Sequence, residues 1–286
     1  MCRVAAQSGA QMPVGRTLLF VPGDRPDRIA RAIATDADAV AVDLEDAVAP
    51  AAKPVARTSA VTAVHAAEPR ANLFLRVNAL SDPEFAADLA VAQDLLPRLT
   101  GVLLPKAETP EDVRRLDDLL GGAAALLPIV ETSRGVLAAP AIAAASPRVA
   151  TLLFGTLDLA ADLGVTPTVG GRELLHARSQ VVLATAAAGL PGPLDGPHAA
   201  LDDTDGLVRA STLARELGFS GKVVLHPRQL APVREAFAPT EAELTRAREV
   251  LDAAREAGTG AFRLPDGTFV DAPVVRRAAA LLGVEA

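Results

Sequence analysis

Two carboxylates have the residue types and the spacing of a divalent metal site. Glu131 directly follows the apolar run 126–130, and Asp158 comes just past the apolar run 151–154. Each run is too short for a helix and is bounded by turn-forming residues, which is typical of buried strands in a parallel sheet. An alanine-rich helix over 135–145 joins the two runs, so both carboxylates should lie at one edge of the sheet.

Such a pair of carboxylates suits Mg²⁺, which prefers oxygen ligands and usually keeps several of its waters. Two ligands on rigid supports would leave room for those waters and for a substrate. In the alternative interpretation, Glu131 only caps the helix that follows it, and Asp158 only opens the next helix.

The same alternation of strand and helix runs through most of the chain. Strands are expected over 17–21, 38–46, 72–77, 101–104, 126–130, 151–154, 190–194 and 222–225, of which the seventh has the least regular pattern. Helices are expected between them, over 26–34, 51–67, 82–96, 110–120, 135–145, 172–188 and 204–217. Eight alternations within residues 15–238 predict an α/β fold, a (β/α)₈ TIM barrel. A doubly wound open sheet is the alternative, but it needs a glycine-rich nucleotide-binding turn that the sequence lacks.

The expected barrel is flanked by a loose tail over residues 1–14 and by a C-terminal extension over residues 239–286. The extension contains helices expected over 240–256 and 274–282, with the glycine-bearing segment AFRLPDGTFVDAP between them. We expect it to be a helical lid that folds over the mouth of a barrel.

Polar side chains stand at the ends of most of the expected strands. They are Asp43, Glu45, Asp46, Arg76, Lys106, Glu131, Asp158, Asp195 and His226. The active sites of barrel enzymes are built at the edge where the strands end. This set of residues therefore predicts an enzyme.

Composition excludes several other functions. The net charge is −7 and there is no basic cluster, which argues against binding to nucleic acid or to anionic membranes. The longest apolar runs fall far short of the ~18 residues of a membrane-spanning helix. The single cysteine, Cys2, is unable to form an internal disulfide, which fits a reducing cytoplasm.

Seven segments together resemble the citrate lyase beta-chain-like carbon–carbon lyases of the HpcH/HpaI aldolase/citrate lyase superfamily, which includes coenzyme A ester lyases. The segments are RTLLFVPGDRPDR, AVAVDLEDAVAPAAKPVAR, LRVNAL, VLLPKAE, PIVETSRGV, FGTLDLAADLG and VVLHPRQL. The resemblance extends in order from Arg16 to about Ala280. It implies a barrel, usually a homotrimer, that binds Mg²⁺ through Glu131 and Asp158 and grips an oxaloacetate- or glyoxylate-like fragment with Arg76.

The stretch GTFVDAPVVRRA is similar to the C-terminal lid of the relatives that act on coenzyme A thioesters. The resemblance implies that Asp271 is the acid/base residue, often reaching into a neighbouring subunit. The alternative for Asp271 is a helix N-cap before Pro273. The chain departs from the family pattern at Leu157, which stands between Thr156 and Asp158 where an acidic residue is common.

Charge indicates roles for the acidic and basic residues at the second and third strand ends. The planar fork of Arg76 suits a substrate carboxylate, or alternatively forms an ion pair with Asp43 or Glu45. Glu45 and Asp46 are expected to bind metal-bound water or to orient Arg76, unless they only cap a helix start.

Other basic residues have predicted contacts with the substrate. Arg16 and Lys106 are expected to bind the substrate, and Arg25 and Arg28 are expected to meet the phosphates of coenzyme A. Arg25 and Arg28 could equally be solvated helix charges. Lys106 could form a Schiff base, but the acidic strand ends favour a metal mechanism, which leaves Lys106 as an ion-pair partner or a contact for coenzyme A.

These features predict a Mg²⁺-dependent carbon–carbon lyase. It would cleave or form a β-hydroxyacyl-coenzyme A, such as citryl-, malyl- or citramalyl-coenzyme A, with an acyl-coenzyme A and a 2-oxo acid as the other reactants. Two alternatives stay open. One is a Mg²⁺-dependent aldolase acting on a free hydroxy-oxo acid without coenzyme A, and the other is a non-catalytic subunit that binds oxo acids.

Overall fold

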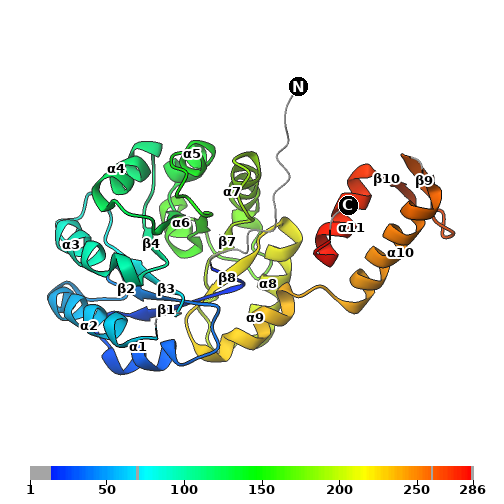
Figure 1. Ribbon diagram of the computed structural model, residues 1–286. Coiled ribbons are helices and arrows are strands. Elements are labelled where there is room, and N and C mark those ends of the chain that lie inside the picture. Colours follow the sequence, from blue (N-terminus) through cyan, green and yellow to red (C-terminus); the bar gives the residue numbers. More distant parts are fainter. Residues whose placement is uncertain (1–13, 69–70, 259, 285–286) are drawn as a thin grey trace. The chain divides into compact units, whose positions relative to one another are not determined.

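The computed structural model describes residues 14–68, 71–258 and 260–284, which form two units (Figure 1). The larger unit includes the described residues up to 237, and the smaller unit includes residues 238–258 and 260–284. The predicted N-terminal tail, including Cys2, lies outside the described residues except for its last residue.

The larger unit is a closed parallel barrel, which confirms the predicted (β/α)₈ fold. Its strands are β1 (Thr17–Pro22), β2 (Ala39–Asp43), β3 (Leu73–Arg76), β4 (Gly101–Leu104), β5 (Ala125–Val130), β6 (Leu153–Phe154), β7 (Leu194–Asp195) and β8 (Gly221–Val224). β1 pairs in parallel with both β2 and β8, which closes the sheet. The seventh strand is shorter and later than predicted, because the prolines before Leu194 have no N–H to donate to a neighbouring strand.

Helices surround the barrel, among them all seven that the alternation predicts and two, over 156–163 and 230–237, for which no range was predicted. They are α1 (Pro26–Ile33), α2 (Lys53–Ala66), α3 (Phe85–Leu95), α4 (Pro110–Leu120), α5 (Ser133–Ala143), α6 (Thr156–Leu163), α7 (Leu175–Ala187), α8 (Thr204–Leu217) and α9 (Leu230–Phe237). Local caps set several boundaries. α4 begins at the capping box formed by Thr109 and Asp112, and α5 begins two residues earlier than predicted because Thr132 accepts a hydrogen bond from the Gly135 amide.

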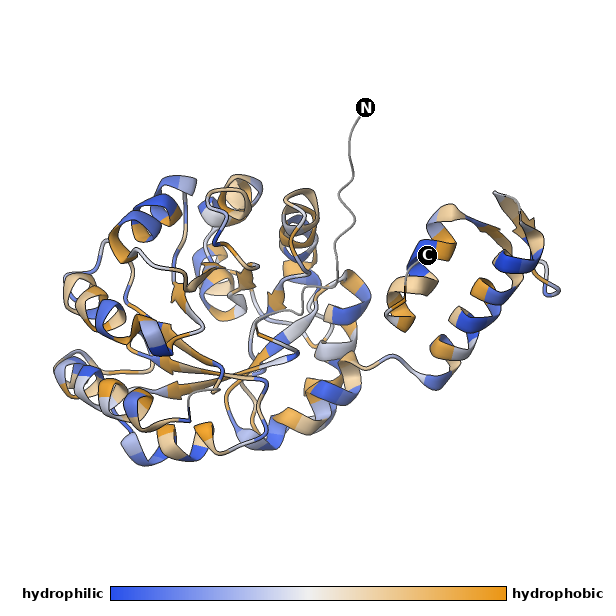
Figure 2. Cartoon of the chain, in the orientation of Figure 1, coloured by the Kyte–Doolittle hydropathy of each residue, from blue (hydrophilic) through white to orange (hydrophobic). Residues whose placement is uncertain are grey.

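The strands are buried on both faces, so the barrel has two apolar layers. In β5, Leu127 and Ile129 belong to the cluster inside the barrel, while Leu126 and Val130 belong to the larger cluster between the strands and the helices. The strands are accordingly mostly hydrophobic along their length, whereas the helices carry hydrophilic residues as well (Figure 2). This continuous burial fixes where each strand ends and thereby positions the polar residues that follow.

The C-terminal unit contains α10 (Glu241–Ala257), the antiparallel pair β9 (Ala261–Arg263) and β10 (Phe269–Asp271), and α11 (Ala272–Leu282). Its small core includes Val250, Leu251 and Val270. Both helices were predicted, but the hairpin between them was not. Among the residues that the structure describes, no helix is both long enough and apolar enough to cross a membrane.

Candidate active site

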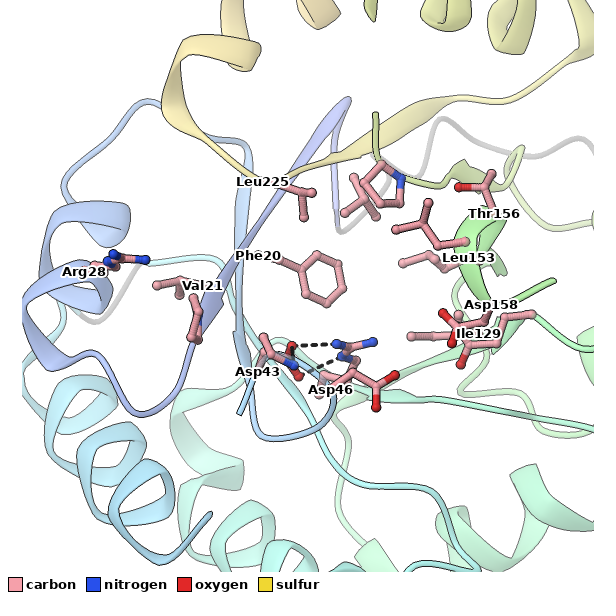
Figure 3. A pocket seen from close by; sticks show the side chains of 18 residues that line it. Phe20, Val21, Arg28, Asp43, Asp46, Ile129, Leu153, Thr156, Asp158 and Leu225 are labelled. Atoms are coloured by element: carbon pink, nitrogen blue, oxygen red, sulfur yellow. Dashed lines mark hydrogen bonds and ion pairs between the residues drawn. The ribbon is translucent and has the colours of Figure 1, made fainter. Parts of the chain in front are cut away.

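A cavity of about 320 Å³ lies at the ends of the barrel strands. Glu131, directly after β5, and Asp158, in the first turn of α6, both line it. In Figure 3, Asp43 and Asp46 lie just below the ring of Phe20, and Asp158 lies to the right of it, near Ile129. The strand–helix–strand unit inferred from the sequence therefore brings the two predicted metal ligands to one space.

Glu131 is held by two backbone features. The side chain is almost fully buried, and its Oε1 accepts a hydrogen bond of 2.8 Å from the amide of Lys106. On its other side lies Gly155, where an added Cβ would come within 2.3 Å of the Glu131 Cβ and 2.5 Å of Oε2. Any residue larger than glycine at position 155 would therefore displace the Glu131 carboxylate.

Burial and neighbouring carboxylates disfavour the ionised form of Glu131, although the charge of Arg76 opposes this effect. Burial is the main cause that raises the pKa of Glu131 to about 8, and the negative charges of Asp158 and Glu45 raise it further. A cation between Glu131 and Asp158 would offset this repulsion and favour the ionised carboxylates.

Arg76, the last residue of β3, is clamped by two acidic residues of the preceding strand end. Its Nε and Nη2 donate to the two carboxylate oxygens of Asp43 at 2.7 and 2.5 Å, and its Nη1 lies 2.8 Å from Glu45 Oε2. The guanidinium also lies over the ring of Phe20, 5.1 Å from its centre. These ion pairs are the alternative considered for Arg76 from the sequence, yet Arg76 also lines the cavity, so its remaining N–H groups can serve a ligand.

Glu45 joins Arg76 to Lys106. The Lys106 ammonium binds Glu45 Oε1 and lies 3.4 Å from Asp46 Oδ2. Burial raises the pKa of Glu45, although the charge of Arg76 opposes this effect. Asp46 is exposed and lines the cavity, so it is the more available of the two to a water or a substrate.

The sequence analysis missed Lys53, which supports this acidic loop from beneath. Its buried ammonium donates to the carbonyls of Leu44 at 2.7 Å and Glu45 at 2.8 Å, and to Asn78 Oδ1 at 2.7 Å. Helical periodicity could have found it, because the buried residues of α2 are Lys53, Ala56, Ala60 and Val64. A lysine on the apolar stripe of a helix needs buried acceptors.

Asp195 does not face the cavity. Leu194 belongs to the cluster inside the barrel, so the next residue along β7 points out toward the helices. There Asp195 binds the buried ammonium of Lys222 and lies 3.1 Å from Arg178 Nε. This buried ion-pair cluster belongs to the packing of the barrel.

Arg16 also does not line the cavity. It precedes the first residue of β1, and its carbonyl accepts a hydrogen bond from the Lys222 amide at 2.9 Å. It therefore lies at the end of the barrel where strands begin, whereas the cavity lies where they finish. This position is inconsistent with the predicted contact between Arg16 and the substrate.

A second cavity, of about 480 Å³, shares part of its lining with the first. Arg28 and Phe20 line both cavities, and His226 lines the second. Arg28 is exposed and forms no ion pair with any described residue, whereas Arg25, at the start of α1, lies 3.7 Å from Asp24. The shared lining makes Arg28 a possible contact for a ligand that extends from one cavity into the other.

Asp271 lies in the C-terminal unit, as the last residue of β10 and the N-cap of α11. Its Oδ1 accepts a hydrogen bond of 3.4 Å from the Val274 amide. The helix cap considered as an alternative is thus present, and the predicted acid/base role stays a prediction.

The donor set in the first cavity fits Mg²⁺. Glu131 and Asp158 are hard oxygen ligands, and no group of three or more His, Cys, Asp or Glu suited to a metal occurs in the described part of the chain. A site with two carboxylates would leave positions for water and substrate, as Mg²⁺ sites usually do.

Comparisons with known proteins agree with this geometry. The family model HpcH/HpaI aldolase/citrate lyase matches residues 16–227. A citrate lyase subunit beta-like protein from Deinococcus radiodurans is 43% identical over 283 residues, with 95% of this chain and 97% of that protein covered. An L-malyl-CoA/beta-methylmalyl-CoA lyase from Rhodobacter capsulatus is 32% identical, with 95% of each covered. Among solved structures, CitE from Mycobacterium tuberculosis in complex with magnesium, acetoacetate and coenzyme A is similar with a TM-score of 0.82 and 36% identity, covering 96% of this chain and 98% of that one.

Proposed function

The chain belongs to the HpcH/HpaI aldolase/citrate lyase family, and on this premise we propose that it is a Mg²⁺-dependent carbon–carbon lyase. It cleaves or forms a β-hydroxyacyl-coenzyme A, with an acyl-coenzyme A and a 2-oxo acid as the other reactants. The observation that carries the proposal is the cavity in which Glu131, Asp158 and Arg76 meet.

Glu131 and Asp158 would hold the metal. When bound, Mg²⁺ supplies Lewis-acid polarisation of the hydroxyl or oxo oxygen and a template for the neighbouring carboxylate. The chain contributes a preset ligand, because the Lys106 amide and Gly155 hold Glu131 in one orientation.

Arg76 would orient the oxo acid. Asp43 and Glu45 fix the plane of its guanidinium, and its remaining N–H groups can donate to the substrate carboxylate. Because contacts within the chain order this guanidinium, little of the binding free energy would be lost in fixing its side chain.

The thioester tail would extend from the first cavity into the second. Arg28 lines both cavities and carries a charge that suits a coenzyme A phosphate, with Arg25 on the same helix start. Lys106 lies at the acidic side of the first cavity, so we propose it as a contact for the oxo acid end rather than for the phosphates.

Cleavage breaks the bond between the hydroxyl-bearing carbon and the carbon next to the thioester. The electron pair stays on the carbon next to the thioester, and this carbon takes up a proton. The hydroxyl gives its proton to solvent water and becomes the oxo group. We propose Asp271 as the residue that protonates this carbon, and that removes the same proton in condensation. The similarity of its surroundings, GTFVDAPVVRRA, to the lid of related thioester lyases supports this assignment.

A panel of citryl-, malyl- and citramalyl-coenzyme A, assayed with and without Mg²⁺, tests the proposal. We expect acyl-coenzyme A and oxo acid to appear with one of these esters, and the rate to disappear when EDTA removes the metal. Glu131→Gln and Asp158→Asn should each weaken Mg²⁺ binding, measured by calorimetry, at least about tenfold. Loss of a residue that only hydrogen-bonds to a metal ligand already lowers metal affinity by about this factor. Glu111→Gln, an exposed carboxylate on α4, is the matched control.

The outcomes separate the alternatives. Cleavage of a free hydroxy-oxo acid, with no reaction of any thioester, would indicate an aldolase that does not use coenzyme A. Oxo acid binding without turnover of any substrate would indicate a non-catalytic subunit. Asp271→Ala should keep Mg²⁺ and oxo acid binding but lose turnover.

A homotrimer and a cytoplasmic location also belong to this proposal. The homotrimer comes from the family resemblance and the location from the single cysteine, and both stay predictions. Light scattering of the purified protein tests the first, and fractionation of the source cells tests the second.

A further inference from the structure

Lys106 has a left-handed backbone conformation, which is unfavourable for residues other than glycine. Its φ is +51°, and it is the one residue other than glycine with positive φ in the described part of the chain. A left-handed backbone brings Cβ too close to the following carbonyl oxygen, so such residues persist where their surroundings hold them.

This conformation directs the Lys106 amide at a predicted metal ligand. The amide donates to Glu131 Oε1 at 2.8 Å, across from β4 to the end of β5. The next amide in the chain, that of Ala107, is also engaged, with the Ile129 carbonyl at 3.1 Å. The peptide on each side of the Lys106 α-carbon thus has a partner on or next to β5.

The side chain of the same residue reaches in another direction. Its ammonium binds Glu45 and lies 3.4 Å from Asp46, in the acidic loop after β2. Glu45 is itself held, because its Oε2 pairs with Arg76 and its carbonyl accepts from Lys53. The ammonium is therefore attached to a rigid partner.

We propose that Lys106 is a positioning residue whose ammonium anchors its own strained backbone, so that its amide orients Glu131 for the metal. The side chain acts through the backbone of the same residue, and the substrate need not touch it. The inference rests on the proposed function, because it takes Glu131 as a ligand of Mg²⁺.

Two substitutions that remove the same charge separate backbone from side chain. Lys106→Ala loses the ammonium and keeps a Cβ, whereas Lys106→Gly loses the ammonium and takes the left-handed conformation freely. Without the ammonium to anchor it, we expect alanine at position 106 to be in the left-handed conformation for only a minor fraction of the time. Since the apparent Kd rises as the competent fraction falls, Mg²⁺ should bind Lys106→Ala about 5- to 30-fold more weakly than Lys106→Gly.

The measurement is Mg²⁺ titration of the full chain by calorimetry, with thermal unfolding of each variant in EDTA to show that it is folded. The Kd of Lys106→Gly for Mg²⁺ should lie within about threefold of that of the unsubstituted protein. Glycine adopts the left-handed conformation without strain, and its amide can still donate to Glu131. Lys106→Arg retains a charged anchor, and we expect it to restore most of the affinity that alanine loses.

Equal weakening in the alanine and glycine variants would overturn the inference, because the ammonium would then act by its charge alone. Unchanged affinity in both variants would overturn it too, because the Glu131 orientation would not depend on Lys106. If the unsubstituted protein binds no Mg²⁺, the proposed function itself fails, and this result is distinct from either pattern among the variants.

Discussion

Arg76 and Asp43 lie opposite one another in register on β3 and β2, and the guanidinium donates to both oxygens of the carboxylate. The two hydrogen bonds hold a flexible side chain as a fixed fork. Glu45 on Nη1 and the ring of Phe20 complete its surroundings. The orientation of Arg76, our proposed contact for the oxo acid, is therefore set from β2 and not from β5 or β6, the strands that precede Glu131 and Asp158.

Removing the charge of Asp43 should loosen this fork. In Asp43→Asn, an amide replaces one acceptor oxygen, so Arg76 loses one of its bonds and most of its compensating charge. We expect the KM for the oxo acid in condensation to rise at least about tenfold, and the free energy of unfolding to fall by about 3 kcal/mol. Steady-state kinetics and urea unfolding measure the two effects, with the exposed Asp94→Asn as control. An unchanged KM would show that Arg76 does not bind the oxo acid.

Gly155→Ala tests whether the space beside Glu131 matters. The new Cβ would meet Glu131 Cβ at 2.3 Å, so the carboxylate must move. We expect destabilisation of about 1–3 kcal/mol, typical of overpacking, together with loss of the stabilisation that saturating Mg²⁺ gives the unsubstituted protein. Thermal unfolding with and without Mg²⁺ measures both. Gly170→Ala, whose Cβ would meet nothing closer than 3.7 Å, should be nearly neutral, and equal Mg²⁺ stabilisation in both variants would contradict the prediction.

Lys53→Met should lower activity as well as stability. It removes the donor that the carbonyls of Leu44 and Glu45 and the Asn78 side chain share, at a cost of about 3 kcal/mol or more in unfolding free energy, although Asn78 Nδ2 still donates to the Leu44 carbonyl. Because these carbonyls belong to the acidic loop, we also expect kcat to fall at least about tenfold. Urea unfolding and initial rates below the unfolding transition measure the two quantities.

Lys222→Met is the matched control, since Lys222 is an equally buried lysine whose partner Asp195 faces the helices. It should lose stability with little change in kcat or in Mg²⁺ affinity. If both variants lowered kcat alike, the loss in Lys53→Met would reflect general destabilisation.

Asp162 gives a pH-dependent contribution to stability. It lies on α6 and accepts a hydrogen bond of 2.7 Å from the Ser133 amide at the start of α5, and hydrogen bonds with Ser133 lower its pKa from the usual 3.8. A lowered pKa in the folded state means that the ionised carboxylate stabilises the fold above pH 3.8, and that this stabilisation is lost as pH falls through the folded-state value.

We therefore expect Asp162→Ala to be less stable than the unsubstituted protein at neutral pH, with a constant difference down to about pH 4 that shrinks at lower pH. Urea unfolding of both proteins from pH 7 to pH 3 measures this difference. A difference that grew on acidification would contradict the assignment. Glu111→Gln, on the exposed face of α4, should show no comparable pH dependence.

Local patterns were sufficient for much of the fold. β4 over Gly101–Leu104, α4 over Pro110–Leu120 and α8 over Thr204–Leu217 were predicted with their observed bounds. Each has a strong local signal, such as the apolar run of the strand or the capping residue at the helix start. β7 has no such signal, and there the prediction was wrong in its bounds.

The residue types and their order along the chain determined the barrel, the identity of Glu131 and Asp158 as metal ligand candidates, and Arg76 as the candidate fork. These follow from the sequence because parallel strands joined by helices bring their ends to one edge. Tertiary structure alone decided which way Asp195 points, that Lys53 holds the acidic loop, that Asp43 and Glu45 clamp Arg76, and that Lys106 is left-handed. The physical reason is that each of these depends on contacts between residues that are separated in sequence. The periodicity of α2 could have marked Lys53 as buried, but it could not have named the acceptors that its ammonium binds.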